Sequence, residues 1–174
     1  MSQNTSKTRE LTYTALAAAI VFVTTYLIRI PNPATGGYEH LGDCMIFLSV
    51  LLLGRKNGAI AGGIGGALSD LLAGAPHYII PTFICKYGMA WIMGTIIKDR
   101  VSSAKAQIAG SVLGGLFQVA GYTLFKVFWY DPKIAVVSIP GNLIQTAFGI
   151  AGFFLVARAL SAKRVGIIRR ELNH

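Results

Sequence analysis

Residues 41–74 read LGDCMIFLSVLLLGRKNGAIAGGIGGALSDLLAG, and this stretch decides the fold. Two apolar runs meet at a short basic turn that contains Arg55 and Lys56. Each run carries an acidic residue at its far end, Asp43 in the first and Asp70 in the second. Because the turn joins the two runs inside one apolar region, we expect both acids to lie on the same side of a membrane.

The second run has a helix face with almost no side chains. Gly58, Gly62 and Gly66 recur every four residues, so they share one face of a helix. Small residues on such a face let a neighbouring backbone approach closely within a membrane. The spacing therefore predicts a tightly packed bundle helix.

The composition indicates an integral membrane protein. The chain of 174 residues is 53% apolar and only 13% charged, with 20 glycines. Several apolar runs approach the roughly 20 residues that a helix needs to cross the hydrocarbon core. The first run, residues 11–30, is long for the core of a cleavable signal and no clear small-residue cleavage site follows it, so we expect it to be retained as a helix.

Six apolar segments predict an all-α integral membrane protein, a compact bundle of six transmembrane helices. The connections are too small to fold separately, so we expect residues 1–174 to form a single membrane domain. The second and third segments are too short to span a bilayer upright by themselves, and a re-entrant hairpin is the alternative. The six predicted helices cover residues 11–30, 41–53, 58–73, 78–97, 106–129 and 135–160.

The basic residues predict the orientation. With six crossings, 12 of the 16 lysines and arginines fall at the termini and in the second and fourth connections. Because basic segments stay preferentially in the cytoplasm, we expect cytoplasmic N- and C-termini in the plasma membrane of a prokaryote. Anchoring near anionic headgroups then explains the net charge of +9, and we do not expect nucleic-acid binding.

Polar residues gather in the outer half of the predicted bundle, and the cytoplasmic halves contain nothing comparable. A charge in lipid costs on the order of 3 kcal/mol, so such groups usually face the bundle interior or a wet cavity. We therefore predict a substrate-binding pocket open to the exterior. Its candidate residues within the segments are Asp43, Asp70, Lys86, Gln118, Tyr122, Asn142 and Gln145.

The connections on the same side would cover this pocket. The first connection, residues 31–40, mixes stiff and permissive backbone with aromatic and ionisable residues, so it could act as a lid. Tyr38 and His40 from the first connection, with His77 and Tyr78 from the third, complete the candidate site. A flat heteroaromatic ligand would suit their stacking and hydrogen-bonding groups.

Each candidate also has a simpler explanation. Asp70 and Lys86 could neutralise one another as a structural pair. Asp43 could be only a helix N-cap, because it begins an apolar run. Tyr38 could belong to an interfacial aromatic belt, and the histidines could be solvated loop residues. The convergence of the whole group favours a pocket more strongly than any single member does.

The sequence carries no motif for membrane-embedded catalysis. It lacks H-E-x-x-H, a G-x-S-x nucleophile with a histidine at membrane depth, and a G-x-x-x-x-G-K-[ST] phosphate loop. Cys44 and Cys85 lie within apolar segments, and we interpret them as packing residues. We therefore predict a protein that is not an enzyme, with no metal and no cofactor, and whose energy for transport comes from elsewhere.

Three sequence features resemble one family of transport proteins. They are LGD at Leu41–Asp43, LLLGRKNGAIAGGIGGALSDLLAG at Leu51–Gly74 and PTFICKYGMAWIMG at Pro81–Gly94. Together they resemble the substrate-binding S components of energy-coupling factor (ECF) vitamin transporters, over most of the chain. The similarity is narrower to the riboflavin-type branch, which includes members assigned to hydroxymethylpyrimidine or pyridoxine uptake.

The resemblance implies a mechanism. S components bind one vitamin near the outer face, under the loop between the first two helices, and associate with a transmembrane coupling subunit and two cytoplasmic ATPases. They deliver the vitamin by reorienting in the membrane. The branch similarity favours hydroxymethylpyrimidine or pyridoxine as the substrate. Riboflavin is a further candidate, because no short motif in the sequence is specific to one vitamin.

The resemblance also implies a docking surface on the first helix. Such helices carry an AxxxA pattern, which Ala15 and Ala19 match, and Ala18 lies beside them. Small residues there would let the coupling subunit approach closely. An internal helix contact is the alternative explanation, because alanine is an ordinary helix residue.

The residues alone also allow a different transport mechanism, one that is driven by an ion gradient. A self-sufficient small permease or channel could couple transport to an ion gradient through Asp70 and Lys86. Such a protein is expected to place polar groups along the whole crossing, including the cytoplasmic half. The sequence does not supply them there.

Overall fold

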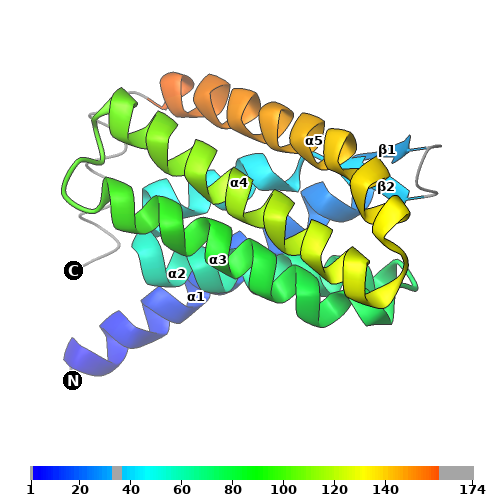
Figure 1. Ribbon diagram of the computed structural model, residues 1–174. Coiled ribbons are helices and arrows are strands. Elements are labelled where there is room, and N and C mark those ends of the chain that lie inside the picture. The colour runs from blue at the N-terminus through cyan, green and yellow to red at the C-terminus, as the bar shows by residue number, and fades with distance from the viewer. Residues whose placement is uncertain (1, 33–36, 161–174) are drawn as a thin grey trace.

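The computed structural model describes residues 2–32 and 37–160, and side chains within 7–29 and 39–160. Five long helices form a bundle, and a short β-hairpin lies at one end of it (Figure 1). The helices are α1 (Ser2–Leu27), α2 (Gly42–Leu72), α3 (Ile79–Ile97), α4 (Ala104–Trp129) and α5 (Pro132–Ala159), with a 3-10 turn η1 (Pro76–Tyr78) before α3. The hairpin consists of β1 (Arg29–Asn32) and β2 (Gly37–His40).

The helices have the length and composition of membrane spans. All five in the described residues are long and apolar enough to cross a membrane. At most half of the most apolar window of each helix is buried inside the protein, so apolar side chains cover much of the outer surface. Such a surface suits a lipid environment, and the all-α membrane class is confirmed.

Helix α2 is the element that departs most from the prediction. Two separate helices were expected at 41–53 and 58–73, but the chain is helical from Gly42 to Leu72 and departs from helical geometry only at Gly54, with φ 81° and ψ −179°. A glycine can adopt this backbone conformation, so no loop is needed. The described residues therefore contain five assigned helices, and the prediction of six helices is not confirmed.

The two halves of α2 nevertheless fold back on one another. A side-chain carbon placed on Gly58 would lie 2.6 Å from the Val50 Cα atom, and one on Gly62 would lie 2.8 Å from Ile46. In a straight helix, residues 8 and 16 positions apart are separated by about 12 and 24 Å. The halves before and after Gly54 are therefore antiparallel neighbours, and the small residues form their contact.

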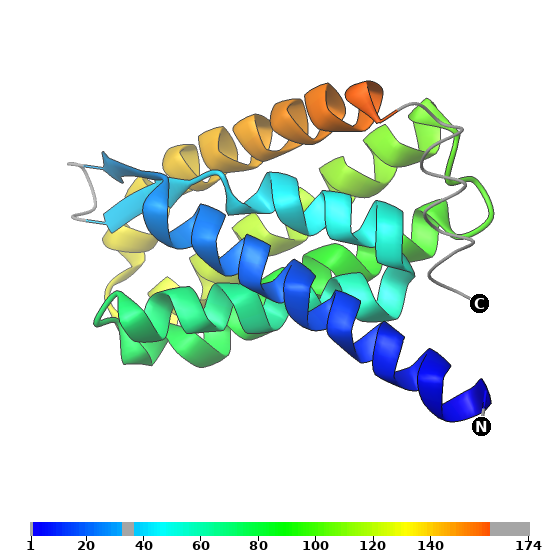
Figure 2. The same cartoon turned by 180° about the vertical axis from the view of Figure 1, so that it is seen from behind.

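The bundle has two different ends. In Figures 1 and 2, the start of α1, the α3–α4 loop and the end of α5 lie at one end. The β-hairpin, η1 and the α4–α5 turn lie at the other, which we call the hairpin end. Asp43 and Asp70 are close to the two ends of the folded-back α2, and both lie toward the hairpin end.

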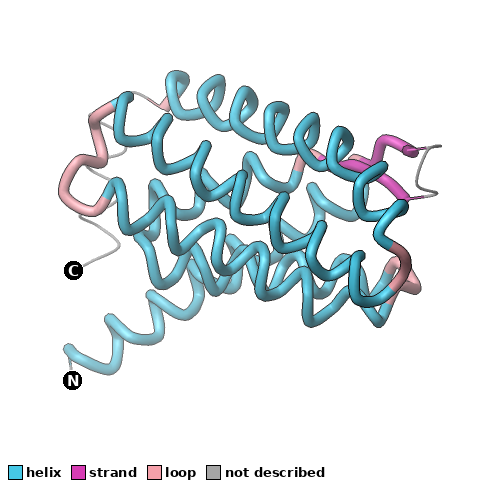
Figure 3. The backbone as a smooth tube through the Cα atoms, viewed as in Figure 1, coloured by secondary structure: helices cyan, strands magenta, loops and turns pink. Residues whose placement is uncertain are grey.

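The first connection is more regular than the expected loop. Arg29 pairs with His40 and Asn32 pairs with Gly37 in an antiparallel register (Figure 3). Because β1 begins at Arg29, helix α1 ends at Leu27 and not at residue 30. At its other end, α1 begins at Ser2 and not at residue 11. The strands were missed because each is only four residues long and β1 contains Pro31, so neither shows a recognisable alternating pattern.

Close backbone contacts hold the helices around α2. A Cβ atom on Gly65 would lie 2.6 Å from the Ala18 carbonyl oxygen, and one on Gly114 would lie 2.5 Å from the Met89 carbonyl oxygen. Residues without side chains at these points let α1 approach α2 and α4 approach α3. Cys44 and Cys85 are buried free thiols, as expected for packing residues.

Candidate functional site

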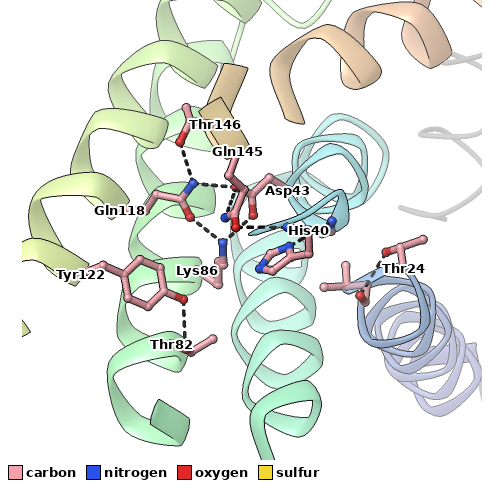
Figure 4. A network of polar contacts seen from close by, with 11 residues as sticks. Thr24, His40, Asp43, Thr82, Lys86, Gln118, Tyr122, Gln145 and Thr146 are labelled. Carbon is pink, nitrogen blue, oxygen red and sulfur yellow. Dashed lines mark hydrogen bonds and ion pairs between the residues drawn. The ribbon is translucent and has the colours of Figure 1, made fainter. Parts of the chain in front are cut away.

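A buried ion pair lies at the centre of the candidate site. Lys86 Nζ on α3 is 2.5 Å from Asp43 Oδ1 on α2, and both side chains are fully buried. Lys86 Nζ also donates to Gln118 Oε1 on α4 at 2.6 Å (Figure 4). A buried ion pair is tolerated when further hydrogen bonds satisfy its remaining donors and acceptors.

Amide side chains extend this ion pair into a network across four helices. Gln118 Nε2 donates to Asp43 Oδ2 at 2.6 Å and to Thr146 Oγ1 at 2.9 Å. Gln145 Nε2 on α5 donates to the same carboxylate oxygen of Asp43 at 3.1 Å. Asp43 thus accepts bonds from α3, α4 and α5, and we call this group, Asp43, Lys86, Gln118, Gln145 and Thr146, the polar network.

The network corrects two of the simpler explanations. Asp43 is not the N-cap of α2, since Leu41 holds that position without a side-chain cap bond and Asp43 bonds to other helices. Lys86 pairs with Asp43 and not with Asp70. Glycines make room for the pair, because a Cβ on Gly149 would lie 2.6 Å from the Asp43 Cβ and one on Gly66 would lie 3.1 Å from the Lys86 Cγ.

A cavity of about 380 Å³ lies beside the network at the hairpin end. His40 and Gln145 belong to its wall, and Tyr122 connects it to the network because its ring lies 5.5 Å from Lys86 Nζ. Tyr122 also donates its hydroxyl hydrogen to Thr82 at 2.9 Å. The lining residues are Glu39, His40, Asp70, Ala75, His77, Tyr78, Thr82, Tyr122, Lys126, Tyr130, Ile134, Asn142 and Gln145.

Most, but not all, of the residues predicted from the sequence reach this cavity. Asp43, Lys86 and Gln118 lie in the polar network beside the cavity and not in its wall, and their contact with a ligand stays a prediction. The side chain of Tyr38 lies outside the described part of the structure. The predicted residues that line the cavity are His40, Asp70, His77, Tyr78, Tyr122, Asn142 and Gln145.

Six lining residues were not among the predicted ones. Thr82 is four positions before Lys86, so helical spacing could have identified it. Lys126 is four positions after Tyr122, and this spacing already places it on the polar face of the same helix. Glu39 neighbours His40 on β2. The others, Ala75, Tyr130 and Ile134, have no such pattern because they reach the cavity from turns and helix ends.

Aromatic rings surround the mouth of the cavity. The Tyr130 hydroxyl and His77 Nε2 are hydrogen-bonded at 2.7 Å, and His77 is in ring contact with Tyr78 and Trp129. Phe125 packs edge-to-face against Tyr78, with ring centroids 5.2 Å apart. Because His77 and Tyr130 are exposed and also line the cavity, this cluster lies where the cavity meets the protein surface.

His40 is a buried residue of β2 and not a solvated loop residue. Its Nδ1 accepts a hydrogen bond from the Gly42 backbone N–H at 3.2 Å, and its own backbone N–H donates to Gln145 Oε1 at 3.3 Å. Burial, followed by the positive charge of Lys86, lowers the pKa of His40 from 6.5 to about 3. The imidazole is therefore neutral at physiological pH, with the hydrogen on Nε2.

The described residues contain no group of three histidine, cysteine or acidic side chains that could hold a metal ion. The cavity instead offers aromatic faces, carboxylates, amides and one ammonium group. Such a wall can bind a small polar ring compound by stacking and hydrogen bonding.

Comparison with known sequences identifies the family. Residues 5–162 match the ECF-type riboflavin transporter, S component. The chain belongs to this family. It is therefore an ECF S component, a vitamin-type substrate-binding subunit of a membrane transporter, and the family is not an enzyme family.

Two relatives and one solved structure resemble this S component. An uncharacterized protein in gap 3'region from Pyrococcus woesei is 38% identical over 130 residues, which cover 75% of this chain and 86% of that protein. The thiamine precursor transporter HmpT from Lactococcus lactis subsp. cremoris (strain MG1363) is 28% identical over 163 residues, covering 92% and 91%. The S component of a bacterial ECF transporter shares the fold, with a TM-score of 0.76 and 21% identity over 89% of this chain and 96% of that chain.

The alanines of α1 are not equivalent in this S component. Ala15 and Ala19 are exposed, whereas Ala18 is buried against Gly65 of α2. Ala18 therefore makes an internal helix contact, and the place of the three alanines in a coupling-subunit interface stays a prediction. ECF S components work with a transmembrane coupling subunit and ATPases, so an exposed small-residue surface on α1 remains relevant to partners.

Proposed function

We propose that this S component binds a small heteroaromatic vitamin or precursor in the cavity at the hairpin end. Hydroxymethylpyrimidine or pyridoxine is the favoured substrate, and riboflavin is the next candidate. The observation that carries the proposal is the cavity wall, which combines aromatic rings with carboxylates, amides and hydroxyls. One relative is named a thiamine precursor transporter, and hydroxymethylpyrimidine is such a precursor.

Asn142 is the residue that we assign to the edge of the ring. Its Nδ2 atom is buried and has no hydrogen-bond partner among residues 2–32 and 37–160, and the residue lines the cavity. A carboxamide offers a donor and an acceptor side by side, which matches the amino group and ring nitrogen of an aminopyrimidine. A buried donor of this kind costs free energy until a ligand satisfies it.

The remaining wall residues supply stacking and acceptors. Tyr78, His77 and Tyr122 present aromatic rings to the cavity, and Glu39 and Asp70 present carboxylates. In this proposal the rings stack on the ligand, and the carboxylates accept hydrogen bonds from its amino and hydroxymethyl groups. Asp43, Lys86 and Gln118 act one layer behind, where they fix the position of Gln145.

We further propose six membrane crossings with both termini in the cytoplasm. The antiparallel halves of α2 would supply two of the crossings, and the start of α1 and the end of α5 lie at the same end of the bundle (Figure 2). The cavity would then open to the cell exterior. Basic residues support this orientation, since those toward the end opposite the hairpin are Lys7, Arg9, Arg55, Lys56, Lys98, Arg100, Lys105 and Arg158.

Delivery requires an external source of energy in this proposal. The chain has no phosphate-loop motif, so ATP hydrolysis would come from two ATPases that act through the coupling subunit. The exposed Ala15 and Ala19 of α1 are the proposed docking surface. The S component would reorient on this partner to release the vitamin inside.

Calorimetric titration of the purified protein with hydroxymethylpyrimidine, pyridoxine and riboflavin tests the binding proposal. We expect one of them to bind with a Kd below about 1 μM. Asn142→Ala should lower the affinity for that ligand by roughly tenfold or more, because a buried hydrogen bond to the ligand is lost. Asn57→Ala is the matched control, because Asn57 bonds to Glu10 far from the cavity.

Two outcomes would contradict the proposal. One is a folded protein that binds none of the three compounds. The other is uptake by vesicles that contain this chain alone under an ion gradient, which would indicate a self-sufficient permease.

A further inference from the structure

Two members of the polar network can hydrogen-bond in one direction only. The Lys86 ammonium group offers donors and no acceptor, and the ionised Asp43 carboxylate offers acceptors and no donor. The two groups are bonded to one another, and both side chains are fully buried. An amide group that bonds to this pair must therefore present its oxygen to Lys86 and its N–H groups to Asp43.

Gln118 is the first amide group that the pair orients. Its Oε1 atom accepts from Lys86 Nζ at 2.6 Å, and its Nε2 atom donates to Asp43 Oδ2 at 2.6 Å. A reversed amide would place its N–H groups against the ammonium group and its oxygen against the carboxylate. Both contacts would be repulsive, so Gln118 has one allowed orientation.

Gln145 extends this order from the bundle to the hairpin. Its Nε2 atom donates to Asp43 Oδ2 at 3.1 Å, which leaves Oε1 as the atom that accepts from the His40 backbone N–H at 3.3 Å (Figure 4). A reversed Gln145 amide would present N–H groups to the His40 N–H, and this bond to the hairpin would be lost. The direction of the hairpin bond therefore follows from the ion pair.

The anchored residue lies where the hairpin joins α2. Strand β2 ends at His40 and α2 begins at Gly42, whose backbone N–H donates to His40 Nδ1 at 3.2 Å. A Cβ atom on Gly42 would collide with the Thr25 side chain of α1, so this junction is closely packed. Because His40 also lines the cavity, the bond to Gln145 holds one part of the cavity wall in place.

We propose that Asp43 is a positioning residue for the hairpin: its carboxylate, held by Lys86, sets the direction of the Gln145 amide and thereby keeps the end of β2 against α5. What residue 43 must provide is an acceptor directed at Gln145, and not a negative charge as such. The anchor is a property of the ligand-free protein. Its consequence for ligand retention rests on the proposed function, because that consequence takes the cavity to be the binding site.

Two charge-free variants test the acceptor directly. Lys86→Met with Asp43→Asn keeps an amide oxygen that can accept from Gln145, whereas Lys86→Met with Asp43→Leu removes every side-chain acceptor at this position. In the ligand-free full chain, we expect hydrogen exchange at the His40 backbone amide to be about tenfold faster, or more, in the Asp43→Leu variant than in the Asp43→Asn variant.

Melting temperatures in detergent separate positioning from stability. They should be equal in the two variants or higher in the Asp43→Leu variant, because an apolar side chain is well tolerated at a buried position that has lost its ion pair. The expected order of exchange rates is thus not the order of stability. Exchange rates that simply follow the melting temperatures would assign Asp43 a purely structural role and overturn the inference.

Gln145→Met identifies the route of the effect. Asp43 follows His40 by three positions, so it could also act on the hairpin through the backbone. Gln145→Met leaves the ion pair intact and should by itself make His40 exchange about tenfold faster. Added to the two charge-free variants, it should remove the difference between them. A difference that persists, or unchanged exchange in Gln145→Met alone, would overturn the inference.

Asp99 supplies the matched control. It is exposed in the α3–α4 loop at the other end of the bundle, so Asp99→Asn and Asp99→Leu should give equal His40 exchange.

The two proposals fail in distinguishable ways. Exchange needs no ligand, so equal His40 rates in the two charge-free variants would overturn the positioning role and leave the proposed function standing. For a vitamin that binds, we expect dissociation to be about tenfold faster in the Asp43→Leu variant than in the Asp43→Asn variant. If no vitamin binds to folded protein, the proposed function fails, and the exchange rates still decide the role of Asp43.

Discussion

At the scale of single residues, Lys86 has the most demanding environment in the protein. A fully buried ammonium group is stable only with its charge compensated, and Asp43 and Gln118 do this from two other helices. The sequence indicated that Lys86 needed a partner, and Asp70 was the partner that it suggested. The choice of Asp43 depends on how the helices are rotated about their axes.

Replacing Lys86 by Met should destabilise the protein strongly. The Asp43 carboxylate would remain buried without its counter-ion, which typically costs about 3–5 kcal/mol. The double variant Lys86→Met with Asp43→Leu should recover part of this loss, because no uncompensated charge remains. Thermal unfolding in detergent measures both, with the exposed Lys133→Met as the control. Equal stability of wild type and Lys86→Met would show that the pair is dispensable.

The protein should become less stable as the pH is lowered, because His40 is buried as a neutral imidazole. Burial lowers the pKa of His40 to about 3, below its usual 6.5, so between these values the unfolded chain binds a proton that the folded chain does not. Stability from this group is therefore complete above pH 6.5 and is lost as pH falls toward 3, by about 2 kcal/mol at pH 5. Melting temperatures between pH 8 and pH 5 measure this loss.

Protonation of carboxylates also destabilises the folded protein in acid, so a variant at position 40 is needed to separate the contribution of His40. His40→Asn keeps a hydrogen-bond acceptor for the Gly42 N–H but cannot be protonated in this range. Its melting temperature should fall less steeply with pH than that of the wild type. Parallel profiles would exclude His40 as the cause.

At the scale of the elements, two short features determine the site. One non-helical residue, Gly54, folds α2 back on itself and brings Asp43 and Asp70 to the hairpin end. The β-hairpin then forms part of the cavity wall through Glu39 and His40. The hairpin is joined to α5 by the hydrogen bond from the His40 N–H to Gln145 Oε1, while Gln145 Nε2 bonds to Asp43.

Gln145→Leu should therefore loosen the hairpin over the bound ligand. We expect the ligand to dissociate faster, with an affinity about tenfold lower, because one amide loses its bonds to both the hairpin and the polar network. Stopped-flow measurement of dissociation tests this. Gln107→Leu is the matched control, since Gln107 bonds to the Val101 carbonyl in the α3–α4 region. An unchanged dissociation rate in Gln145→Leu would contradict the role of the hairpin bond.

At the scale of the whole molecule, the buried ion pair and its amide partners lie toward one end of an apolar bundle. The cavity and the polar network lie toward the hairpin end, whereas the core around Phe47, Val50 and Met93 is apolar. The proposed binding subunit needs a ligand site at one end only. A self-sufficient permease would instead need polar groups along the whole membrane crossing. In the proposed function transport depends on a partner, and this makes the outer face of α1 the part to test.

Ala15→Trp or Ala19→Trp should abolish copurification with the coupling subunit and leave vitamin binding intact. Both alanines are exposed on α1, and a large side chain there prevents close helix approach. Ala18→Trp should instead destabilise the isolated protein, because Ala18 is packed against Gly65. Copurification that survives both exposed substitutions would place the docking surface elsewhere.

The sequence by itself determined what depends on local pattern. Apolar length and composition indicated a helical membrane protein, and the four-residue spacing of Gly58, Gly62 and Gly66 indicated close packing. The basic turn between two acidic ends indicated that Asp43 and Asp70 would lie near the same end. These features follow from helix periodicity and from the cost of polar groups in lipid, so they need no knowledge of distant contacts.

Only the tertiary structure decided which groups meet. The network joins positions 43, 86, 118 and 145, and the rotation of each helix determines whether their side chains face one another. It separated Asp43, Lys86 and Gln118 from the cavity wall and added Thr82 and Lys126 to it. Such pairings follow from packing over long sequence separations, because the same local patterns are compatible with several helix rotations.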